Sequence, residues 1–443
     1  MRRGTDVHRI CLALPTNREC SAAITALGDE AAYAARRFGV ETHLLVLDSS
    51  DGPTREAHAR TVAALPEVPH VVVHHLDETA QRDFLRRAAD RAALAEPDRT
   101  LGLMLPDALS YGACTNRAFL VAAALGCRSV HRRDSDSSYQ TFGGEPVFPV
   151  HHELASLGKS AADAWAGVSE VALDPAIAGR TVSMVGASFI GELSVDIGGI
   201  RELDKDVYDE VVGLWAPGHW SAEQRRELAE ESFKGAGVLP FAGDHSTLTL
   251  VDPMHVDMSN IAFDRDVYER LPLPPATATI GSDYFLIHAV HDAGLPGVLH
   301  NRHIENWYTG ERRTHAGFLA YQERFVKFLL SMLYLHYVYA RMADAGTALL
   351  DDEGRLDPEP FAAFLAESVR LDRTENERRL DTVAAAYGRL GGKYAEFARG
   401  MTADRHRLLD EAARDTEDFV ALIGDWEALV RACRDTEVPG GPR

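Results

Sequence analysis

The chain has 443 residues, of which 46% are hydrophobic and 26% are charged, a composition that supports a sizeable buried core and excludes wholesale disorder. Its length exceeds that of one small domain, so we expect two or three structural units. Asp and Glu total 67 against 46 Lys and Arg, and the resulting formal charge of −21 argues against binding of bulk nucleic acid through its phosphates.

Short apolar runs alternate with amphipathic helical stretches through the first third of the chain. The expected strands cover residues 9–14, 42–47 and 68–75, and the expected helices cover residues 20–38, 54–64 and 78–95. A further apolar run at residues 101–106, a helix at 113–125 and a short strand at 129–132 follow. This alternation predicts parallel βαβ units in an open α/β sheet.

The pattern changes twice further along the chain. It is irregular between residues 137 and 260, where strand-like pieces at 181–185 and 246–251 and a polar helix near 222–233 are expected. From residue 318 onward helical periodicity replaces the alternation, and the expected helices cover residues 318–345, 358–369, 373–397 and 403–433. The aromatic run at 325–339 has core spacing, with a dimer face as the alternative.

Cysteine usage and apolar run length bear on where the protein works. Five cysteines without a Cys-x-x-Cys pair indicate neither a disulfide framework nor a structural zinc site, and reduced thiols fit a cytoplasmic protein. The apolar stretch at residues 10–15 is too short for a signal peptide, and no stretch reaches the ~18 uninterrupted apolar residues that span a bilayer. We therefore expect a cytoplasmic protein with no transmembrane segment.

Three familiar signatures are excluded by their spacing. Residues 157–160 end like a phosphate-binding P-loop, but the glycine required five positions before Gly158 is Glu153. In the segment 186–191 the second glycine comes one position too late for a nucleophile elbow. No Gly-x-Gly-x-x-Gly follows the first expected strand, which argues against a dinucleotide-binding fold.

An Asp-x-Asp tripeptide is the candidate for chemistry. Asp134 and Asp136 follow the expected strand 129–132, and two carboxylates one residue apart can face a divalent cation that also takes diphosphate oxygens. The same pattern at 204–206 and 264–266 precedes Val-Tyr, where we expect helix N-caps and first-turn acids. Only the first pair lies at the carboxyl end of an expected strand, where open sheets place ligands. A solvated turn is the alternative.

The order of motifs resembles the GT-A glycosyltransferases of the family 2 type, which carry an Asp-x-Asp motif and use nucleotide-sugar donors. The matching segments are residues 14–18, 46–52, 112–117 and 134–136, followed by 258–267 and 279–286 on the acceptor side. The resemblance implies that the donor is contacted by Pro15, Thr16, Arg18, Asp48, Gly112, Asn116, Arg117 and Asp134. It implies an α/β GT-A fold, an open mixed sheet flanked by helices, with a helical C-terminal domain.

The resemblance also implies a metal site and a catalytic acid. Mg²⁺ or Mn²⁺ would be held by Asp134, Asp136 and a sheet-edge histidine, His300 or His303. Strand alternation places the two histidines on opposite faces, so we expect only one to serve. Asp283 would face the acceptor hydroxyl as general base of an inverting reaction, although Ser282 stands where the family usually has Glu.

Several of these residues also have structural interpretations. Asp48 and Arg18 can cap turns, and Asp283 can be an acid at a helix N-terminus. His288 and His291 share a helix face at i, i+3 spacing, where packing is favoured over ligation. Further along, Trp307 and Tyr308 are candidates for stacking on a sugar ring.

The resemblance implies a division of the chain and a reaction. We expect a catalytic domain at 1–312 with a nucleotide-binding half at 8–136 and an acceptor half at 137–312, then a helical domain at 313–438 and a tail at 439–443. The implied activity is a metal-dependent hexosyltransferase that moves a sugar from a nucleoside diphosphate donor to a small or peptide-like acceptor. The soluble character and the helical tail favour a bacterial protein. A nucleotidyltransferase and a catalytically silent binding subunit are the alternatives, and the C-terminal helices are a candidate homodimer surface.

Overall fold

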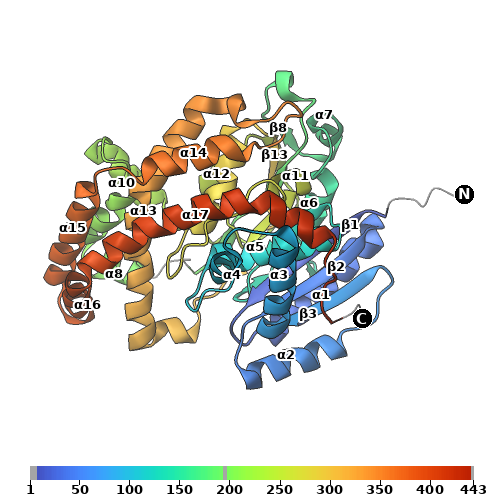
Figure 1. The fold of residues 1–443 in the computed structure, drawn as a ribbon, viewed down its shortest axis with the longest axis horizontal. Helices are drawn as coiled ribbons and strands as arrows, with labels where there is room; N and C mark the ends of the chain where they lie inside the picture. Colours follow the sequence, from blue (N-terminus) through green and yellow to red (C-terminus); the bar gives the residue numbers. More distant parts are fainter. Residues whose placement is uncertain (1–6, 193–196, 441–443) are drawn as a thin grey trace, which may run out of the picture.

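The computed structural model describes residues 7–192 and 197–440 (Figure 1). Among these residues, nine strands form one open mixed sheet in the order β3-β2-β1-β4-β12-β9-β13-β11-β8. The strands are β1 (Arg9–Thr16), β2 (Glu41–Asp48), β3 (Val71–Asp77), β4 (Ser129–Arg133), β8 (Glu170–Val171), β9 (Met184–Gly186), β11 (Ser246–Thr249), β12 (Asn260–Asp264) and β13 (Gly297–His300). The expectation of an open α/β sheet is confirmed.

The strands from β3 to β4 are parallel, and β12 runs antiparallel between β4 and β9. The chain leaves β1 toward β2 on one side and later returns as β4 on the other, so the carboxyl ends of β1 and β4 flank a topological switch point. Open α/β sheets bind ligands in the crevice outside such a point. This location is where the candidate site lies.

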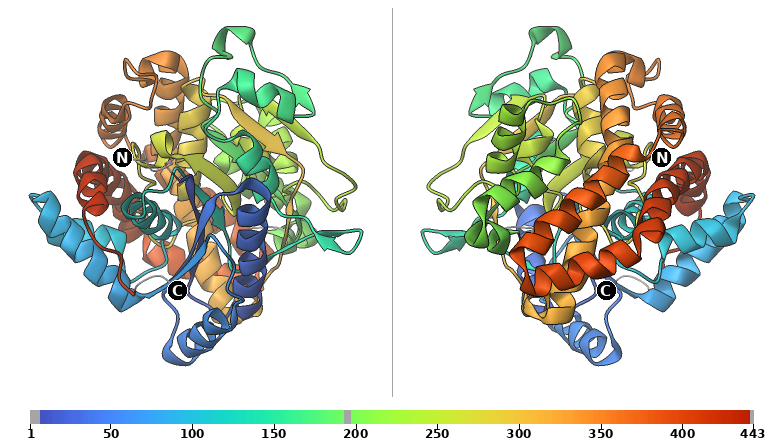
Figure 2. Two further views of the ribbon diagram at one scale, coloured as in Figure 1. Left: turned by 90° about the vertical axis from the view of Figure 1, so that its right-hand side faces the viewer. Right: turned by 90° about the vertical axis from the view of Figure 1, so that its left-hand side faces the viewer.

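Because side chains alternate along β1 and β2, these strands place apolar side chains on both faces of the sheet. Leu12 and Leu14 pack on one face with Ile24 and Leu27 of α1 (Ser21–Phe38), whereas Cys11 and Ala13 join the core on the other face. That second face is covered by α3 (Glu78–Ala92) and α5 (Tyr111–Ala124). Figure 2 shows α1 and α3 on opposite sides of the N-terminal strands. Burial on both faces explains why these strands are almost continuously apolar.

The remaining described elements are shorter. A three-stranded sheet has the order β10 (Phe189–Gly191), β14 (Ile304–Asn306) and β5 (Ser137–Tyr139), and β6 (Thr141–Phe142) pairs with β7 (Glu145–Pro146). The helices of this part are α2 (Gly52–Ala64), α4 (Pro97–Met104), α6 (Val150–Ser156), α7 (Ala161–Ala164), α8 (Gly198–Leu203), α9 (Lys205–Val212), α10 (Ala222–Glu231), α11 (Arg265–Tyr268) and α12 (Phe285–Asp292). Short 3₁₀ turns are η1 (Trp165–Gly167), η2 (Pro175–Ile177), η3 (Gly213–Trp215), η4 (Pro253–His255), η5 (Ser282–Tyr284) and η6 (Gly310–Arg313).

The C-terminal part is helical, as expected. It comprises α13 (His315–Ala345), η7 (Gly346–Leu349), α14 (Pro358–Ser368), α15 (Thr374–Leu390), α16 (Gly392–Ala403) and α17 (Arg405–Arg434). Figure 1 shows α17 crossing the molecule to reach α3 and α4. Phe419 of α17 makes an edge contact with Phe285 at 4.9 Å between ring centroids, and Trp426 Nε1 donates to the Tyr268 carbonyl at 3.1 Å. One continuous apolar core therefore joins the helices to the sheet.

Two local expectations differ from the structure. The apolar run at residues 101–106 overlaps the end of α4, because Leu101 and Met104 sit one helical turn apart and pack into the core together. The helix expected over 373–397 is divided into α15 and α16, because Gly391 and Gly392 both have positive φ (72° and 51°), which ends the first helix. No helix in the described ranges combines the length and apolarity needed to cross a bilayer.

Candidate functional site

Two adjoining cavities of about 210 Å³ each open outside the carboxyl ends of β1 and β4. The polar cavity is lined by the turn after β1, Ser49 after β2, the segment 105–110 and the first turns of α5. The apolar cavity is lined by residues from η3, η4, η5, α12 and α13. The two cavities share a wall formed by Tyr111, Arg132, Asp134, Asp136 and Arg312.

The polar cavity begins where β1 ends. The Thr16 hydroxyl donates to the Arg18 carbonyl at 3.0 Å and accepts from the Arg18 amide at 3.3 Å, which closes a tight turn. Pro15, Thr16 and Arg18, three of the residues expected to contact the donor, line this cavity. From the opposite side α5 contributes Arg117, whose Nη1 donates to the Met104 carbonyl at 2.5 Å.

Asp136 is held between two arginines that are far apart in the sequence. Its Oδ2 accepts from Arg18 Nη1 at 2.9 Å and from Arg312 Nη2 at 2.8 Å. Arg312 lies on η6, just before α13. Burial opposes the charge of Arg312, but the Asp136 carboxylate outweighs it and the pKa of the guanidinium is raised. Arg312 was not predicted from the sequence, because nothing near it marks a contact with Asp136.

Arg132 joins Asp134 of the shared wall to Asp283, which lines the apolar cavity alone. Its Nη2 lies 3.0 Å from Asp134 Oδ1, and its Nη1 lies 3.4 Å from Asp283 Oδ2. Burial raises the pKa of Asp134 to about 6 against the opposing effect of Arg132, and Asp136 raises it further. Burial also raises the pKa of Asp283, which Arg132 partly offsets. Strand alternation on β4 turns Arg132 toward the cavities.

Arg133, the next residue, points to the opposite face of β4. Its guanidinium donates to Glu30 of α1 and to Glu153 of α6 at 2.8–3.1 Å, and Glu153 also contacts His131 at 2.7 Å. These side chains are almost fully buried, so each charge is compensated inside the core. This network fixes the end of β4, and with it the start of the Asp-x-Asp loop.

The histidines expected as metal ligands lie elsewhere. His300 is buried on β13, where its ring stacks on His152 at 5.3 Å, and burial holds its pKa well below the usual range. His303 Nδ1 accepts from the Ser188 amide at 3.2 Å. Neither lines either of the two adjoining cavities, and residues 7–192 and 197–440 contain no group of three or more His, Cys, Asp or Glu placed to hold a metal ion. The expected set of Asp134, Asp136 and one of the two histidines is therefore not assembled.

Asp134 and Asp136 without a histidine fit a metal ion that takes most of its ligands from water and substrate. Both residues belong to the shared wall of the two cavities. Mg²⁺ is commonly bound by one or two carboxylates and takes its remaining ligands from water and substrate phosphates. The pair fits a cation bound in that way, although Asp136 would have to exchange an arginine contact for it.

Asp48 does not reach the polar cavity. Its Oδ2 accepts from His58 at 2.8 Å and from His75 at 2.9 Å, and its Oδ1 accepts from the Ser50 amide at 2.9 Å. Burial acts to raise the pKa of Asp48, but these hydrogen bonds outweigh it and lower the pKa. The carboxylate is fully buried and anchors the turn after β2, so Ser49 lines the cavity in its place.

Gly112 and Asn116 also have structural positions. A Cβ at Gly112 would lie 1.8 Å from the Pro274 carbonyl oxygen, so only glycine permits this approach. The Asn116 amide pairs with both backbone groups of Leu273 at 2.8 Å. These two residues lock α5 against the segment that leads to Asp283. In the predicted block 112–117, the cavity is lined by Cys114 and Arg117.

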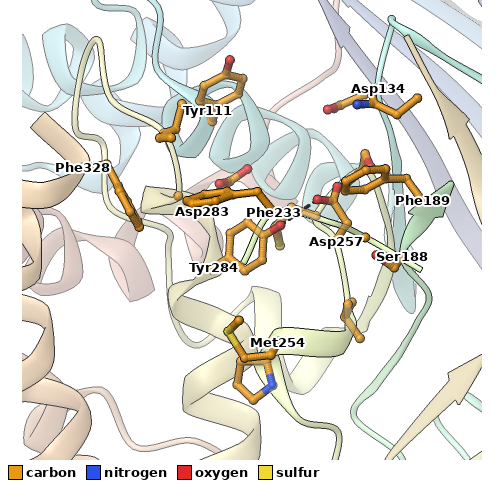
Figure 3. Close-up of a pocket in the computed structure, with 18 of the residues that line it drawn as sticks. Tyr111, Asp134, Ser188, Phe189, Phe233, Met254, Asp257, Asp283, Tyr284 and Phe328 are labelled. Carbon is orange, nitrogen blue, oxygen red and sulfur yellow. Dashed lines mark hydrogen bonds between the residues drawn. The ribbon is translucent and has the colours of Figure 1, made fainter. Parts of the chain in front are cut away.

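The apolar cavity contains further acids that the sequence did not indicate (Figure 3). Asp257 Oδ2 accepts from the Tyr284 hydroxyl at 2.7 Å. Asp134, Asp257 and Asp283 turn their carboxylates toward the same space. Asp257 directly precedes the segment 258–267, and this adjacency is the signal that was available. Trp307 is half exposed, and its indole N–H donates to the Ser138 hydroxyl. It lines neither cavity.

The remaining candidates have structural roles. Asp204 and Asp264 are N-caps of α9 and α11, as expected, with Asp264 accepting from the Asp266 amide at 3.0 Å. His288 stacks on Tyr339 with 3.8 Å between ring centroids, and burial lowers its pKa to about 3. His288 is therefore neutral at physiological pH, on the wall of the apolar cavity.

The sequence matches the family of unknown function DUF6271 over residues 8–441. No curated protein matches the chain. The structure is similar to a mannosyltransferase from Pyrobaculum calidifontis in complex with GDP-Man and Mn²⁺ (15% identity, 98% of this chain and 89% of that chain covered, TM-score 0.36). It is also similar to a mycobacterial protein (18% identity, 73% of this chain and 74% of that chain covered, TM-score 0.34). A third similar structure is core-mannan synthase A from Aspergillus fumigatus in its Mn/GDP form (7% identity, 66% of this chain and 66% of that chain covered, TM-score 0.24).

Proposed function

We propose that this chain, which belongs to the DUF6271 family of unknown function, is a glycosyltransferase that uses a nucleoside diphosphate sugar. The observation that carries the proposal is the pair of cavities with one shared wall. Group transfer between two substrates needs two adjoining sites that bring the reacting atoms together. A polar cavity suits the donor and an apolar one the acceptor, with the sugar at the wall between them.

The arginines of the polar cavity support an anionic donor. Four of them have a buried Nε–H with no hydrogen-bond partner among the described residues: Arg18, Arg117, Arg132 and Arg312. A buried donor without a partner is costly, and a diphosphate supplies acceptor oxygens for such groups. The location outside β1 and β4 agrees with nucleotide binding at a switch point.

The two acids of the shared wall would hold a divalent cation together with the donor. We assign this role to Asp134 and Asp136, because both line the two cavities. A bound Mg²⁺ or Mn²⁺ would neutralise charge that develops on the departing diphosphate. Arg18 and Arg312, which now pair with Asp136, would then be free to contact phosphate oxygens.

Asp283 is the candidate for the proton step. It lies in the wall of the apolar cavity, next to the shared wall, and burial raises its pKa, which makes its carboxylate a stronger proton acceptor than that of an ordinary Asp. If the reaction inverts the anomeric centre, Asp283 takes the proton of the acceptor hydroxyl. If the reaction retains it, Asp283 positions groups around the anomeric carbon.

The test is a thermal-shift series with UDP, GDP, ADP and TDP, each with and without Mn²⁺, followed by assay of the matching nucleotide sugar. One nucleotide should raise the melting temperature in a metal-dependent manner, because ligands of the native state stabilise it. Asp136→Asn should abolish the shift. Asp206→Asn is the matched control, since Asp206 ends the same tripeptide pattern but lies exposed on α9.

The products separate the remaining possibilities. Release of a nucleoside diphosphate together with a glycosylated acceptor supports the proposal. Release of pyrophosphate would indicate nucleotidyl transfer instead. Nucleotide binding without turnover of any donor would indicate a silent binding subunit, and no nucleotide binding at all would contradict the proposal.

A further inference from the structure

The inner wall of the apolar cavity is built mainly from aromatic and thioether side chains. Trp215 of η3, Phe233 after α10 and Phe328 of α13 form one aromatic cluster, with ring centroids 5.2–6.2 Å apart. Three methionines, Met254, Met258 and Met332, line the same space. Aromatic rings and thioethers offer favourable contacts to a ring-shaped ligand and few hydrogen bonds.

Two carboxylates of this cavity lie where an acceptor hydroxyl could reach the shared wall: Asp283 is 3.4 Å from Arg132, and Asp257 accepts from the Tyr284 hydroxyl. The lining also includes Glu231 and Lys234 on either side of Phe233 in the sequence, and His288, which is neutral. A ligand with hydroxyls around its whole body, such as a saccharide, would leave several of them without partners in the aromatic part, at a cost for each. A ligand with an apolar body and one hydroxyl at these two carboxylates has no such penalty.

Charge restricts the ligand further. Five lining side chains are carboxylates and three are cations, and two of those cations, Arg132 and Arg312, already pair with acids of the shared wall. A carboxylate or phosphate on the ligand would therefore meet like charge in a partly desolvated space. Uncharged and cationic ligands avoid this repulsion.

The volume sets the size. An apolar cavity of roughly 150 Å³ is sufficient to bind benzene, and this cavity measures about 210 Å³. Resting on the proposed function, we infer that the acceptor is a compact aromatic alcohol of one or two fused rings, without an anionic group, whose hydroxyl lies at Asp283. This class is narrower than small or peptide-like acceptors in general.

Direct binding tests the inference without any donor. Isothermal titration calorimetry with 2-naphthol, 6-hydroxy-2-naphthoate and methyl glucoside compares a neutral ring, the same ring with a carboxylate and a polar acceptor. We expect 2-naphthol to bind at least ten-fold more tightly than the other two. Equal or tighter binding of the carboxylate or the glucoside overturns the inference, as does the absence of 2-naphthol binding.

Variants locate the binding. Trp215→Leu and Phe233→Leu keep the wall apolar but remove a ring, and each should weaken 2-naphthol binding about ten-fold. Trp165→Leu is the control, because Trp165 is 49% exposed and does not line the cavity. Met254→Lys adds a cation at the exposed rim and should improve binding of 6-hydroxy-2-naphthoate. Unchanged affinities in all the cavity variants, with native circular dichroism, would overturn the assignment.

The nucleotide series separates this inference from the function on which it rests. Metal-dependent nucleotide binding without 2-naphthol binding overturns the acceptor class and leaves the glycosyltransferase proposal standing. Binding of 2-naphthol without binding of any nucleotide supports the ligand class of the cavity and contradicts the glycosyltransferase proposal.

Discussion

At the scale of single residues, Asp283 combines burial with one close cation. Its pKa is raised by burial, with Arg132 at 3.4 Å acting in the opposite direction and Asp257 adding to the rise. A carboxyl with a raised pKa gains a proton at a higher pH than an ordinary Asp. The basic form that can accept the acceptor's proton is therefore lost earlier on acidification.

We expect Asp283→Asn to lower kcat by roughly 10²–10⁴, the usual contribution of a general base. Donor affinity should stay within a few-fold, because Asp283 does not line the polar cavity. In the wild-type protein the rate should fall with decreasing pH, with a midpoint above the ordinary Asp value of ~3.9. Steady-state kinetics across pH measure both effects, and an unchanged kcat in the variant would remove Asp283 from the proton step.

Burial also raises the pKa of Asp264, and here the consequence is for stability. It caps α11 by accepting from the Asp266 amide, and burial is the main cause that raises its pKa from 3.8 to about 6. The native protein binds more protons than the unfolded chain between these values. The contribution of Asp264 to stability therefore decreases as the pH rises from about 4 to about 6, and this loss persists at neutral pH.

We expect Asp264→Asn to raise the free energy of unfolding at pH 7.5, by at most about 3 kcal/mol from the size of the shift, because Asn caps nearly as well as Asp. In urea titrations the difference in unfolding free energy between the variant and the wild type should grow as the pH rises from 4 to 6. Asp51→Asn is the control: Asp51 caps α2 in the same way but is exposed, and its pKa is lowered. A loss of stability in Asp264→Asn at pH 7.5 would contradict this account.

At the scale of elements, α5 is positioned by close backbone contact. The Pro274 carbonyl oxygen occupies the place of a Cβ at Gly112, and this contact sets the distance between α5 and the segment leading to η5. Gly102 in α4 is the contrasting case, with open space around its missing Cβ. An alanine at Gly112 therefore tests the backbone contact, whereas an alanine at Gly102 tests helix propensity alone.

We expect Gly112→Ala to destabilise the protein by about 1–3 kcal/mol or more, the cost of overpacking against rigid backbone. Gly102→Ala should be neutral or stabilising by up to about 1 kcal/mol, because alanine favours the helix. Urea denaturation at constant m-value measures both. Equal effects of the two substitutions would mean that α5 moves away without cost.

How much was predictable differs between elements and site. The N-terminal strands and the C-terminal helices follow from local periodicity, and their order and bounds were close to the structure. The directions in which individual side chains point could not be predicted from this periodicity. His300 has the right residue type at a sheet strand but points into the core against His152, and Asp48 ends its strand as expected but is enclosed by two histidines. Such packing depends on residues far away in sequence.

At the scale of the whole molecule, the C-terminal helical part is structurally continuous with the sheet and adjoins the candidate site. The core that includes β1 also contains residues of α13 and α17. Arg312, which lies on η6 a few residues before α13, donates to Asp136 within the shared wall. The start of the helical part therefore positions a side chain of the proposed donor site, and α13 also lines the apolar cavity.

Substitution of Arg312 therefore tests whether the C-terminal helical part contributes to nucleotide binding in the polar cavity. Arg312→Gln removes the charge and one of the two cations that hold Asp136, so we expect nucleoside diphosphate affinity to fall at least ten-fold by calorimetry. Arg313→Gln is the control, because the adjacent Arg313 is 59% exposed and pairs with Glu192 outside the polar cavity. Since the interaction is ionic, the wild-type affinity should also decrease with rising salt, and less steeply in Arg312→Gln. If both variants bind nucleotide like the wild type, the donor site is complete without the helical part, and its only remaining contribution is to the acceptor cavity.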